Sequence, residues 1–166
     1  MGPAPGLNWL QTYAFKAVGD EAMYLWERRL TLTQVAERLA LLTPISRQQI
    51  EAALGPIERA GYVYADDAPG NPDIVLTLSA KGLDEYCHRF ITGYGNVRLA
   101  ILKLVCQDPG ADVHEIAQRT GHPGLLVEHT LDVAQSMRLL RVTKHGQYIT
   151  VSEIAPQLRR MVSGAA

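Results

Sequence analysis

Residues 46–86 read SRQQIEAALGPIERAGYVYADDAPGNPDIVLTLSAKGLDEY, and this stretch decides the fold. Ile50, Leu54 and Ile57 recur at helical spacing, and Gly61 follows as a typical helix terminator. Two short apolar runs then flank the turn-rich connector ADDAPGNPD, a pattern typical of a β-hairpin. The stretch therefore predicts a long helix, a hairpin and a closing helix.

A shorter helix is predicted just before this stretch. The segment LTLTQVAERLA, residues 30–40, places Val35 and Leu39 on one face, and Thr33 is expected to cap its N-terminus. Pro44 then interrupts the pattern with a turn. A short helix, a turn, a longer helix and a hairpin follow one another in the order of a winged helix-turn-helix module.

The beginning of the chain adds a further helical segment. The helical pattern begins at Leu7, an interruption is expected at Gly19-Asp20, and Asp20 is expected to cap a second helix. Residues 1–6 contain two prolines and two glycines and are predicted to be a disordered head.

Aromatic residues are concentrated in this opening segment. Trp9, Tyr13 and Trp26 are expected in the interface of a homodimer, because aromatic residues concentrate at subunit interfaces. Packing of these side chains onto their own domain is the alternative.

The second half of the chain repeats the first. VAERL at 35–39 corresponds to IAQRT at 116–120, an offset of 81 residues. IEAAL at 50–54 corresponds to VEHTL at 127–131, an offset of 77. The offsets differ by four, so the first inter-helix turn holds four extra residues.

The fold class predicted is mostly α with small β-hairpin wings (α+β), arranged as two tandem winged-helix modules. The first module spans residues 7–92 and carries the extra N-terminal helix, and the second spans residues 93–166. In the second, Asp112 is expected to cap the short helix, and the hairpin is expected to turn at His145-Gly146.

The segment VLTLSAKGLDEY, residues 75–86, resembles the wing end and the following helix of many bacterial winged-helix regulators. Together with the preceding GYVYADD, it is similar to transcriptional regulators of the multidrug-resistance-regulator type. The resemblance implies a DNA-binding transcriptional regulator, in which the longer helix of each module enters a major groove and the wing lies beside the backbone.

Five residues are the candidates for contact with double-stranded DNA. Arg47, Gln48 and Gln49 begin the first long helix, and arginine and glutamine read guanine and adenine through paired hydrogen bonds. Arg141 and Lys144 lie in the second wing and are expected to contact phosphates. A solvated polar helix start is the alternative for the first three.

The sequence departs from a DNA-binding pattern in three places. Pro56, after Gly55, lies inside the first long helix and predicts a kink or an early end. The first wing carries aspartates that repel phosphate: Asp66, Asp67 and Asp73. The second long helix has no Arg or Lys before Arg138, and four of its residues are expected to face solvent: Gly124, Leu125, Glu128 and His129.

Composition limits the remaining function classes. The 166 residues carry a formal net charge of −1, which is low for a protein that depends on phosphate contacts. No signal segment or membrane span is evident, so a cytoplasmic location is expected. Cys87 and Cys106 are isolated and the histidines are scattered, so no metal site, cofactor or catalytic site is expected, and the chain is predicted not to be an enzyme.

Two functions remain open. The first is a DNA-binding transcriptional regulator. The alternative is a protein-interaction subunit, for example a kleisin-binding component of chromosome organisation, because such tandem winged-helix proteins resemble this chain in layout and lack basic recognition helices.

Overall fold

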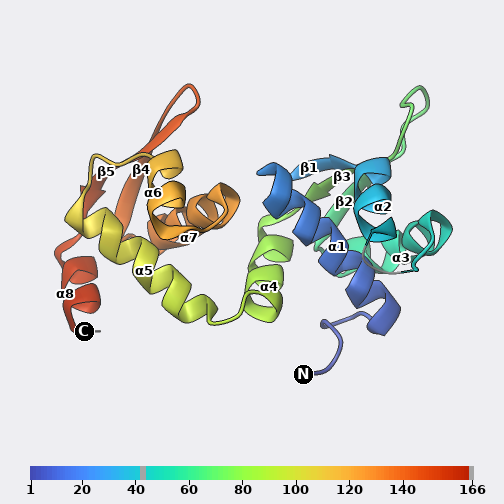
Figure 1. The fold of residues 1–166 in the computed structure, drawn as a ribbon, viewed down its shortest axis with the longest axis horizontal. Helices are drawn as coiled ribbons and strands as arrows, with labels where there is room; N and C mark the ends of the chain where they lie inside the picture. Colours follow the sequence, from blue (N-terminus) through green and yellow to red (C-terminus); the bar gives the residue numbers. More distant parts are fainter. Residues whose placement is uncertain (42–43, 165–166) are drawn as a thin grey trace. The chain divides into compact units, whose positions relative to one another are not determined.

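The computed structural model describes residues 1–41 and 44–164. The chain is α+β, with most residues in helices and two small antiparallel sheets. It divides into two compact units, residues 1–92 and residues 93–166, and each is described by itself (Figure 1). No helix of the described residues is long and apolar enough to cross a membrane.

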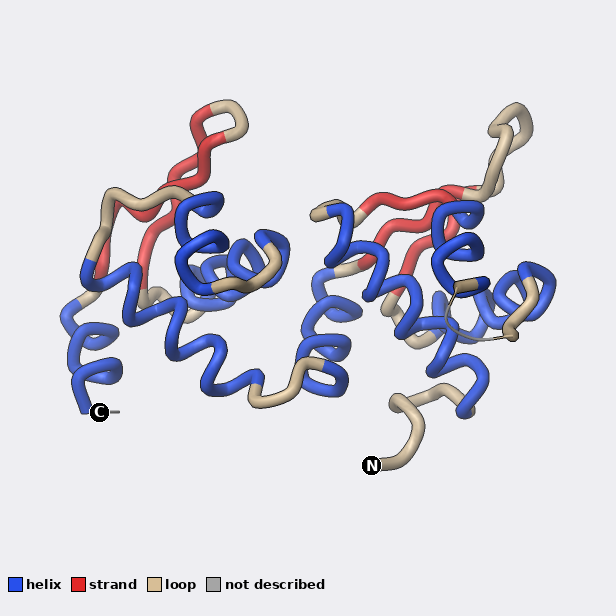
Figure 2. Tube along the Cα trace, viewed as in Figure 1, coloured by secondary structure: helices blue, strands red, loops and turns tan. Residues whose placement is uncertain are grey.

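The first unit combines four helices with a three-stranded sheet among the residues described (Figure 2). Its sheet has the order β1-β3-β2, and both strand pairs are antiparallel. The elements are α1 (Trp9–Leu25), β1 (Arg29–Thr31), α2 (Leu32–Ala40), α3 (Arg47–Arg59), β2 (Val63–Asp66), β3 (Val75–Leu78) and α4 (Ala80–Phe90).

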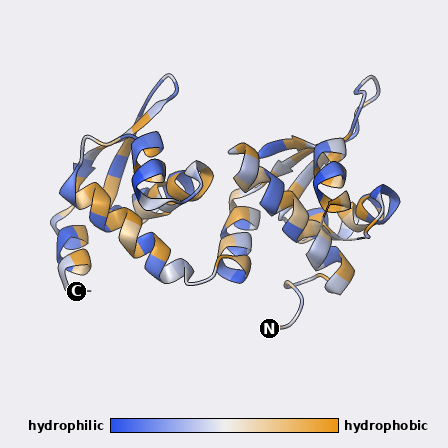
Figure 3. Ribbon diagram, in the orientation of Figure 1, coloured by the Kyte–Doolittle hydropathy of each residue, from blue (hydrophilic) through white to orange (hydrophobic). Residues whose placement is uncertain are grey.

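The core of this unit lies between the helices and the sheet. Phe15 on α1 is fully buried and stacks on the ring of Tyr62, with 4.8 Å between ring centroids. Ile57 of α3 and Leu76 of β3 are also fully buried. The buried residues are mostly hydrophobic, while the connector at the tip of the hairpin is pale to hydrophilic in colour (Figure 3).

Helix α1 runs without a break, which corrects the interruption predicted at Gly19-Asp20. Gly19 is required by packing, because a Cβ there would lie 2.0 Å from Cδ2 of Tyr86. The Tyr86 hydroxyl donates a hydrogen bond of 2.7 Å to Asp20, so Asp20 fixes α4 against α1 and caps no helix.

Helix α2 begins two residues earlier than predicted. Thr31, not Thr33, is its N-cap, and its side chain forms a capping box with Gln34. Thr31 also ends the short strand β1, which was not predicted.

Residues 1–6 pack on the first unit, in contrast to the disordered head predicted. Ala4 is 1% exposed, and its amide donates to the Thr12 hydroxyl. The Tyr62 hydroxyl donates to the carbonyl of Pro5, and Arg89 donates to that of Gly2. Proline and glycine prevent regular structure here, but hydrogen bonds from distant residues hold the segment in place.

The second unit follows the same order without a counterpart of β1 among the described residues. A single β-bridge between Asp112 and Thr150 takes the place of the three residue pairs that β1 forms with β3 in the first unit. Its elements are α5 (Tyr94–Gln107), α6 (Val113–Thr120), α7 (Gly124–Ser136), β4 (Leu140–His145), β5 (Tyr148–Ile154) and α8 (Pro156–Gly164).

Corresponding elements keep the offsets seen in the sequence. Helix α3 spans 47–59 and α7 spans 124–136, an offset of 77 at both ends. Strands β2 and β4 begin at Val63 and Leu140, again 77 apart. Helices α2 and α6 begin 81 residues apart, at Leu32 and Val113.

The long helices differ from two expectations. Of the kink or early end predicted at Pro56, the early end is wrong, because α3 continues to Arg59 and the Pro56 carbonyl accepts a hydrogen bond from the Ala60 amide. In α7, Gly124, Leu125 and His129 are buried instead of facing solvent. They are covered because α7 packs against α5, α6 and β4 at once.

Candidate interaction site

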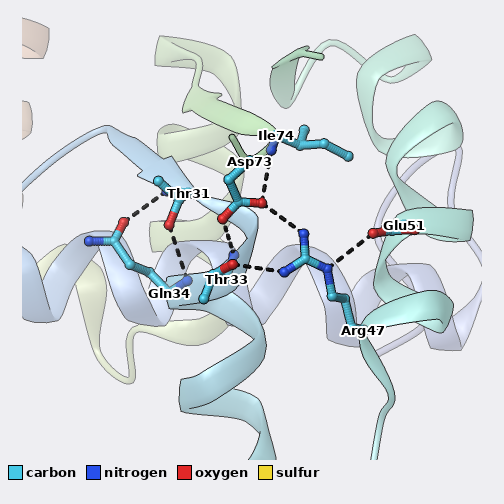
Figure 4. Close-up of polar contacts among 7 residues, drawn as sticks. All are labelled: Thr31, Thr33, Gln34, Arg47, Glu51, Asp73 and Ile74. Atoms are coloured by element: carbon cyan, nitrogen blue, oxygen red, sulfur yellow. Dashed lines mark hydrogen bonds and ion pairs between the residues drawn. The ribbon is translucent and has the colours of Figure 1, made fainter. Parts of the chain in front are cut away.

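Arg47 is held at the start of α3 by three neighbours (Figure 4). Its guanidinium donates to Asp73 Oδ1 at 2.8 Å, to Thr33 Oγ1 at 2.7 Å and to Glu51 Oε1 at 3.2 Å. These contacts engage all three guanidinium nitrogens. Arg47 therefore links α3 to the connector just before β3 and to the first turn of α2.

Asp73 is the centre of this cluster. Its carboxylate also accepts from the backbone amides of Thr33 at 3.0 Å and Ile74 at 2.8 Å. Burial would raise the pKa of Asp73, but the hydrogen bonds from Thr33, Arg47 and Ile74 outweigh it and lower the pKa to about 2. The carboxylate is thus ionised at any physiological pH, and its negative charge forms an ion pair with the guanidinium of Arg47.

The neighbouring glutamines have different environments. The Gln49 side chain accepts the Ser46 amide in the capping box of α3, so it serves its own helix. Gln48 is exposed on the outer face of α3. Of the three residues predicted to read bases, Gln48 alone has no interaction among those the structure describes.

In the second unit, the two predicted DNA-contact residues also face carboxylates. Arg141 Nη1 lies 3.1 Å from Glu153 Oε1, and both side chains are about two-thirds exposed. Lys144 Nζ lies 3.6 Å from Glu128 Oε1 on α7. Exposed pairs of this kind contribute roughly 0.2–1 kcal/mol, so they orient the side chains without locking them.

The aromatic residues predicted at a dimer interface fall into two places. Trp9 and Tyr13 are each about half exposed on the first turns of α1 and stack with 6.2 Å between ring centroids. Trp26 is the C-cap at the opposite end of the same helix, roughly 25 Å away at 1.5 Å per residue. Trp26 therefore does not extend the surface that Trp9 and Tyr13 form.

Two exposed large hydrophobic side chains of the first unit were not singled out from the sequence. Tyr64 on β2 is 59% exposed, and Leu41 after α2 is 85% exposed. Tyr64 alternates with buried Val63, and this period-2 alternation is the signal that could have identified it.

The described residues contain no group of three or more His, Cys, Asp or Glu side chains that could hold a metal ion. Within the part of the chain that the structure describes, buried Cys87 and half-buried Cys106 form no disulfide, and burial raises the pKa of the Cys106 thiol. The site is therefore a charged surface formed by the start of α3, the connector before β3 and the first turn of α2.

Comparisons with known proteins add little. No family model matches the sequence, so the resemblance to multidrug-resistance-regulator-type proteins gains no support. No curated protein matches it either. A chain from the "Structure of the ESCRT-II endosomal trafficking complex" is similar over 92% of this chain and 96% of that chain, with 13% identity and a TM-score of 0.34. A TM-score this low carries no weight for fold or function.

Proposed function

We propose that the chain is a protein-interaction subunit built from two winged-helix units, in which the long helices do not read DNA. The observation that carries this proposal is the charge of the elements that a winged-helix regulator presents to DNA. Residues 47–74, which contain α3 and the first hairpin up to β3, hold two arginines and five carboxylates, a net charge of −3. One of these arginines, Arg47, is shared between two of the carboxylates.

The net negative charge of these elements repels the phosphates of a DNA duplex. DNA carries one negative charge per roughly 1.7 Å of helix axis, and binding depends on cations that replace its counterions. Residues 1–92 have a net charge of −3 as a whole, so no other part of the first unit compensates for the acidic elements. A protein surface of mixed or positive charge is the better complement.

The second unit supports the same proposal. Eight of the thirteen residues of α7 are buried, so this helix offers few side chains to a groove. The wing cations Arg141 and Lys144 face Glu153 and Glu128. Residues 93–166 have a net charge of only +2, which supports weak non-specific attraction at best.

The winged-helix assignment rests on element order and strand order. In the first unit β1 precedes two helices, and the hairpin that follows completes the sheet in the order β1-β3-β2. The second unit keeps two helices, a hairpin and a closing helix at the same offsets.

Two measurements test the proposal together. Labelled duplexes are titrated with the full chain at low and at physiological salt, and we expect no saturable binding at the higher salt. The tagged chain is also purified from nuclease-treated extract, and we expect a protein to remain bound in a stoichiometric complex. Saturable, sequence-dependent DNA binding that is weakened by Arg47→Ala would instead show that the chain is a DNA-binding regulator.

A further inference from the structure

The two units share the turn that leads from the long helix into the hairpin. Ala60 and Met137 are the C-caps of α3 and α7. Two positions later, the carbonyls of Tyr62 and Leu139 each accept, at 2.9 Å, the amide of the residue that precedes the closing helix. The offset of 77 therefore pairs Ala60 with Met137, and Tyr62 with Leu139, in the structure as well as in the sequence.

In the first unit, the beginning of the chain covers this turn. Residues 4–7 form a tight turn of their own, in which the Leu7 amide donates to the Ala4 carbonyl at 2.9 Å and Gly6 has a φ of +79°. The Tyr62 hydroxyl donates to the Pro5 carbonyl at 3.0 Å. A Cβ added at Gly6 would lie 3.7 Å from Cβ of Ala60. A proline-glycine turn thus lies against both Ala60 and Tyr62.

The second unit has no segment of its own for this place. Helix α4 ends at Phe90 and α5 begins at Tyr94, so only residues 91–93 precede the helices of the second unit. Met137, which corresponds to Ala60, is 61% exposed, and Met161 of α8 is 49% exposed beside it. Two large apolar side chains therefore face solvent where the first unit is covered.

A cavity opens beneath these methionines. It has a volume of about 80 Å³, which is room for one aliphatic side chain, and Leu139 lies in its lining. In the first unit, the larger ring of Tyr62 stacks on Phe15 of α1. Leucine in place of tyrosine leaves space beside α5, at Arg98 and Leu102.

The lining of the cavity is apolar apart from two residues. Thr130 donates its hydroxyl to the Leu126 carbonyl of its own helix, so it offers no donor to the cavity. Arg98 is half-buried, with its guanidinium 5.1 Å from the centroid of the Tyr94 ring, and no ion pair is formed by it among the residues described. Methionine side chains are unbranched and adapt to an irregular apolar partner.

We infer that this cavity is the docking site for a short apolar loop of a protein partner, a proline-glycine turn like that of residues 4–7. The site, here called the methionine groove, comprises Arg98, Leu102, Val133, Met137, Leu139 and Met161. The loop lies across the two methionines and inserts one aliphatic side chain toward Leu139. Arg98 donates to a main-chain carbonyl of the loop, as the Tyr62 hydroxyl does to Pro5. The inference rests on the proposed protein-binding function and names its surface and the chemistry of the partner.

The four methionines of the chain provide the assay. Met137 and Met161 line the groove, whereas Met1 and Met23 belong to the first unit. The full chain, with ¹³C-labelled methionine methyl groups, is titrated with the capped peptide Gly-Pro-Ala-Pro-Gly-Leu, which has the sequence of residues 2–7. We expect saturable shifts at Met137 and Met161 and none at Met1 and Met23. The same peptide with serine in place of leucine should bind roughly tenfold more weakly, because it loses the buried side chain.

A matched pair of variants tests the groove itself. Met137→Gln keeps the length of the side chain but makes the rim polar, so it should weaken peptide binding roughly tenfold, as followed at Met161. Tyr148→Gln is the control, because Tyr148 is 54% exposed on β5 of the same unit and lies outside the groove. It should leave the affinity unchanged. Both residues are exposed, so neither change disturbs a core.

Three results would overturn the inference. The first is an absence of shifts at Met137 and Met161, and the second is equal binding by the leucine and serine peptides or by the natural chain and Met137→Gln. The third is movement of both signals when the chain is concentrated without peptide, because a second copy would then cover the groove.

The proposed function can fail separately. If the chain retains its protein partner and the Met137→Gln chain binds that partner equally well, the methionine groove is wrong and the function stands. If the chain binds a duplex and no protein, both are wrong.

Discussion

Replacing Asp73 with asparagine should destabilise the first unit by about 2 kcal/mol at neutral pH. Asparagine keeps the shape and one acceptor but loses the charge that faces Arg47 and the amides of Thr33 and Ile74. The pKa of Asp73 is lowered from 3.8 to about 2. Each tenfold change in proton affinity is worth about 1.4 kcal/mol, and the Asp73 side chain is only 14% exposed, so solvent screening removes little of this.

The pH dependence has a defined sign. The folded pKa lies below the unfolded one, so the stabilisation is fully present above about pH 4 and is lost as the pH falls through 2. At pH 3 about half of it should remain. The difference between the natural chain and Asp73→Asn should therefore shrink from about 2 to about 1 kcal/mol between pH 7 and pH 3.

Tryptophan fluorescence isolates the first unit in this assay. Both tryptophans of the chain, Trp9 and Trp26, lie in residues 1–92. Urea titrations followed by fluorescence thus report the unfolding of that unit alone. Asp67→Asn is the control, because Asp67 is exposed in the hairpin, and it should change the free energy of unfolding by less than about 0.5 kcal/mol.

Two results would refute this reasoning. One is an equal loss of stability in Asp73→Asn and Asp67→Asn. The other is a loss in Asp73→Asn that stays constant between pH 7 and pH 3, which would mean that the carboxylate charge contributes nothing.

Three further predictions concern packing, assembly and DNA. Gly82→Ala should cost about 3 kcal/mol in the same fluorescence assay, because its Cβ would lie 2.0 Å from the Tyr62 carbonyl oxygen. Gly55→Ala should be neutral or stabilising by up to about 1 kcal/mol, because its Cβ would meet only Arg59 Nη1, at an ordinary contact distance of 3.4 Å. Trp9 and Tyr13 each expose an area of roughly 100 Å², well short of the roughly 800 Å² that each partner buries in a stable interface. Sedimentation should therefore find only weak self-association, which is lost when both residues are replaced by serine. A tight dimer would contradict this estimate. Lys144→Ala should leave the DNA titrations unchanged. If it instead lowered the slope of log affinity against log salt concentration by about one, Lys144 would contact a phosphate and the DNA-binding regulator would be favoured again.

Local signals accounted for most of what the sequence predicted correctly. Asp112 begins a helix as predicted, because the capping box joins residues only three positions apart. The same rule selects Thr31 over Thr33, since Gln34 stands three residues after Thr31, so that error was avoidable. The hairpins were predicted from turn residues that act within the connector itself.

The features that sequence reasoning missed depend on distant residues. Gly19 reads as a helix interruption until Tyr86, 67 positions later, is known to lie against it. Arg47 was placed correctly at a helix start, but its partner Asp73 is 26 residues away on the far side of the hairpin. No local pattern shows that an arginine expected to face guanine is already bound to a carboxylate.

The packing of the first six residues affects how the chain emerges during synthesis. Gly2 and Pro5 receive their hydrogen bonds from Arg89 and Tyr62, which lie 87 and 57 positions later. At roughly 5–20 residues per second, the beginning of the chain waits several seconds for these partners to leave the ribosome. During that interval Ala4 and Leu7, both buried in the finished unit, remain available to chaperones. Residues 2–5 are therefore among the last residues of the first unit to reach their folded positions, although they are synthesised before its helices and strands.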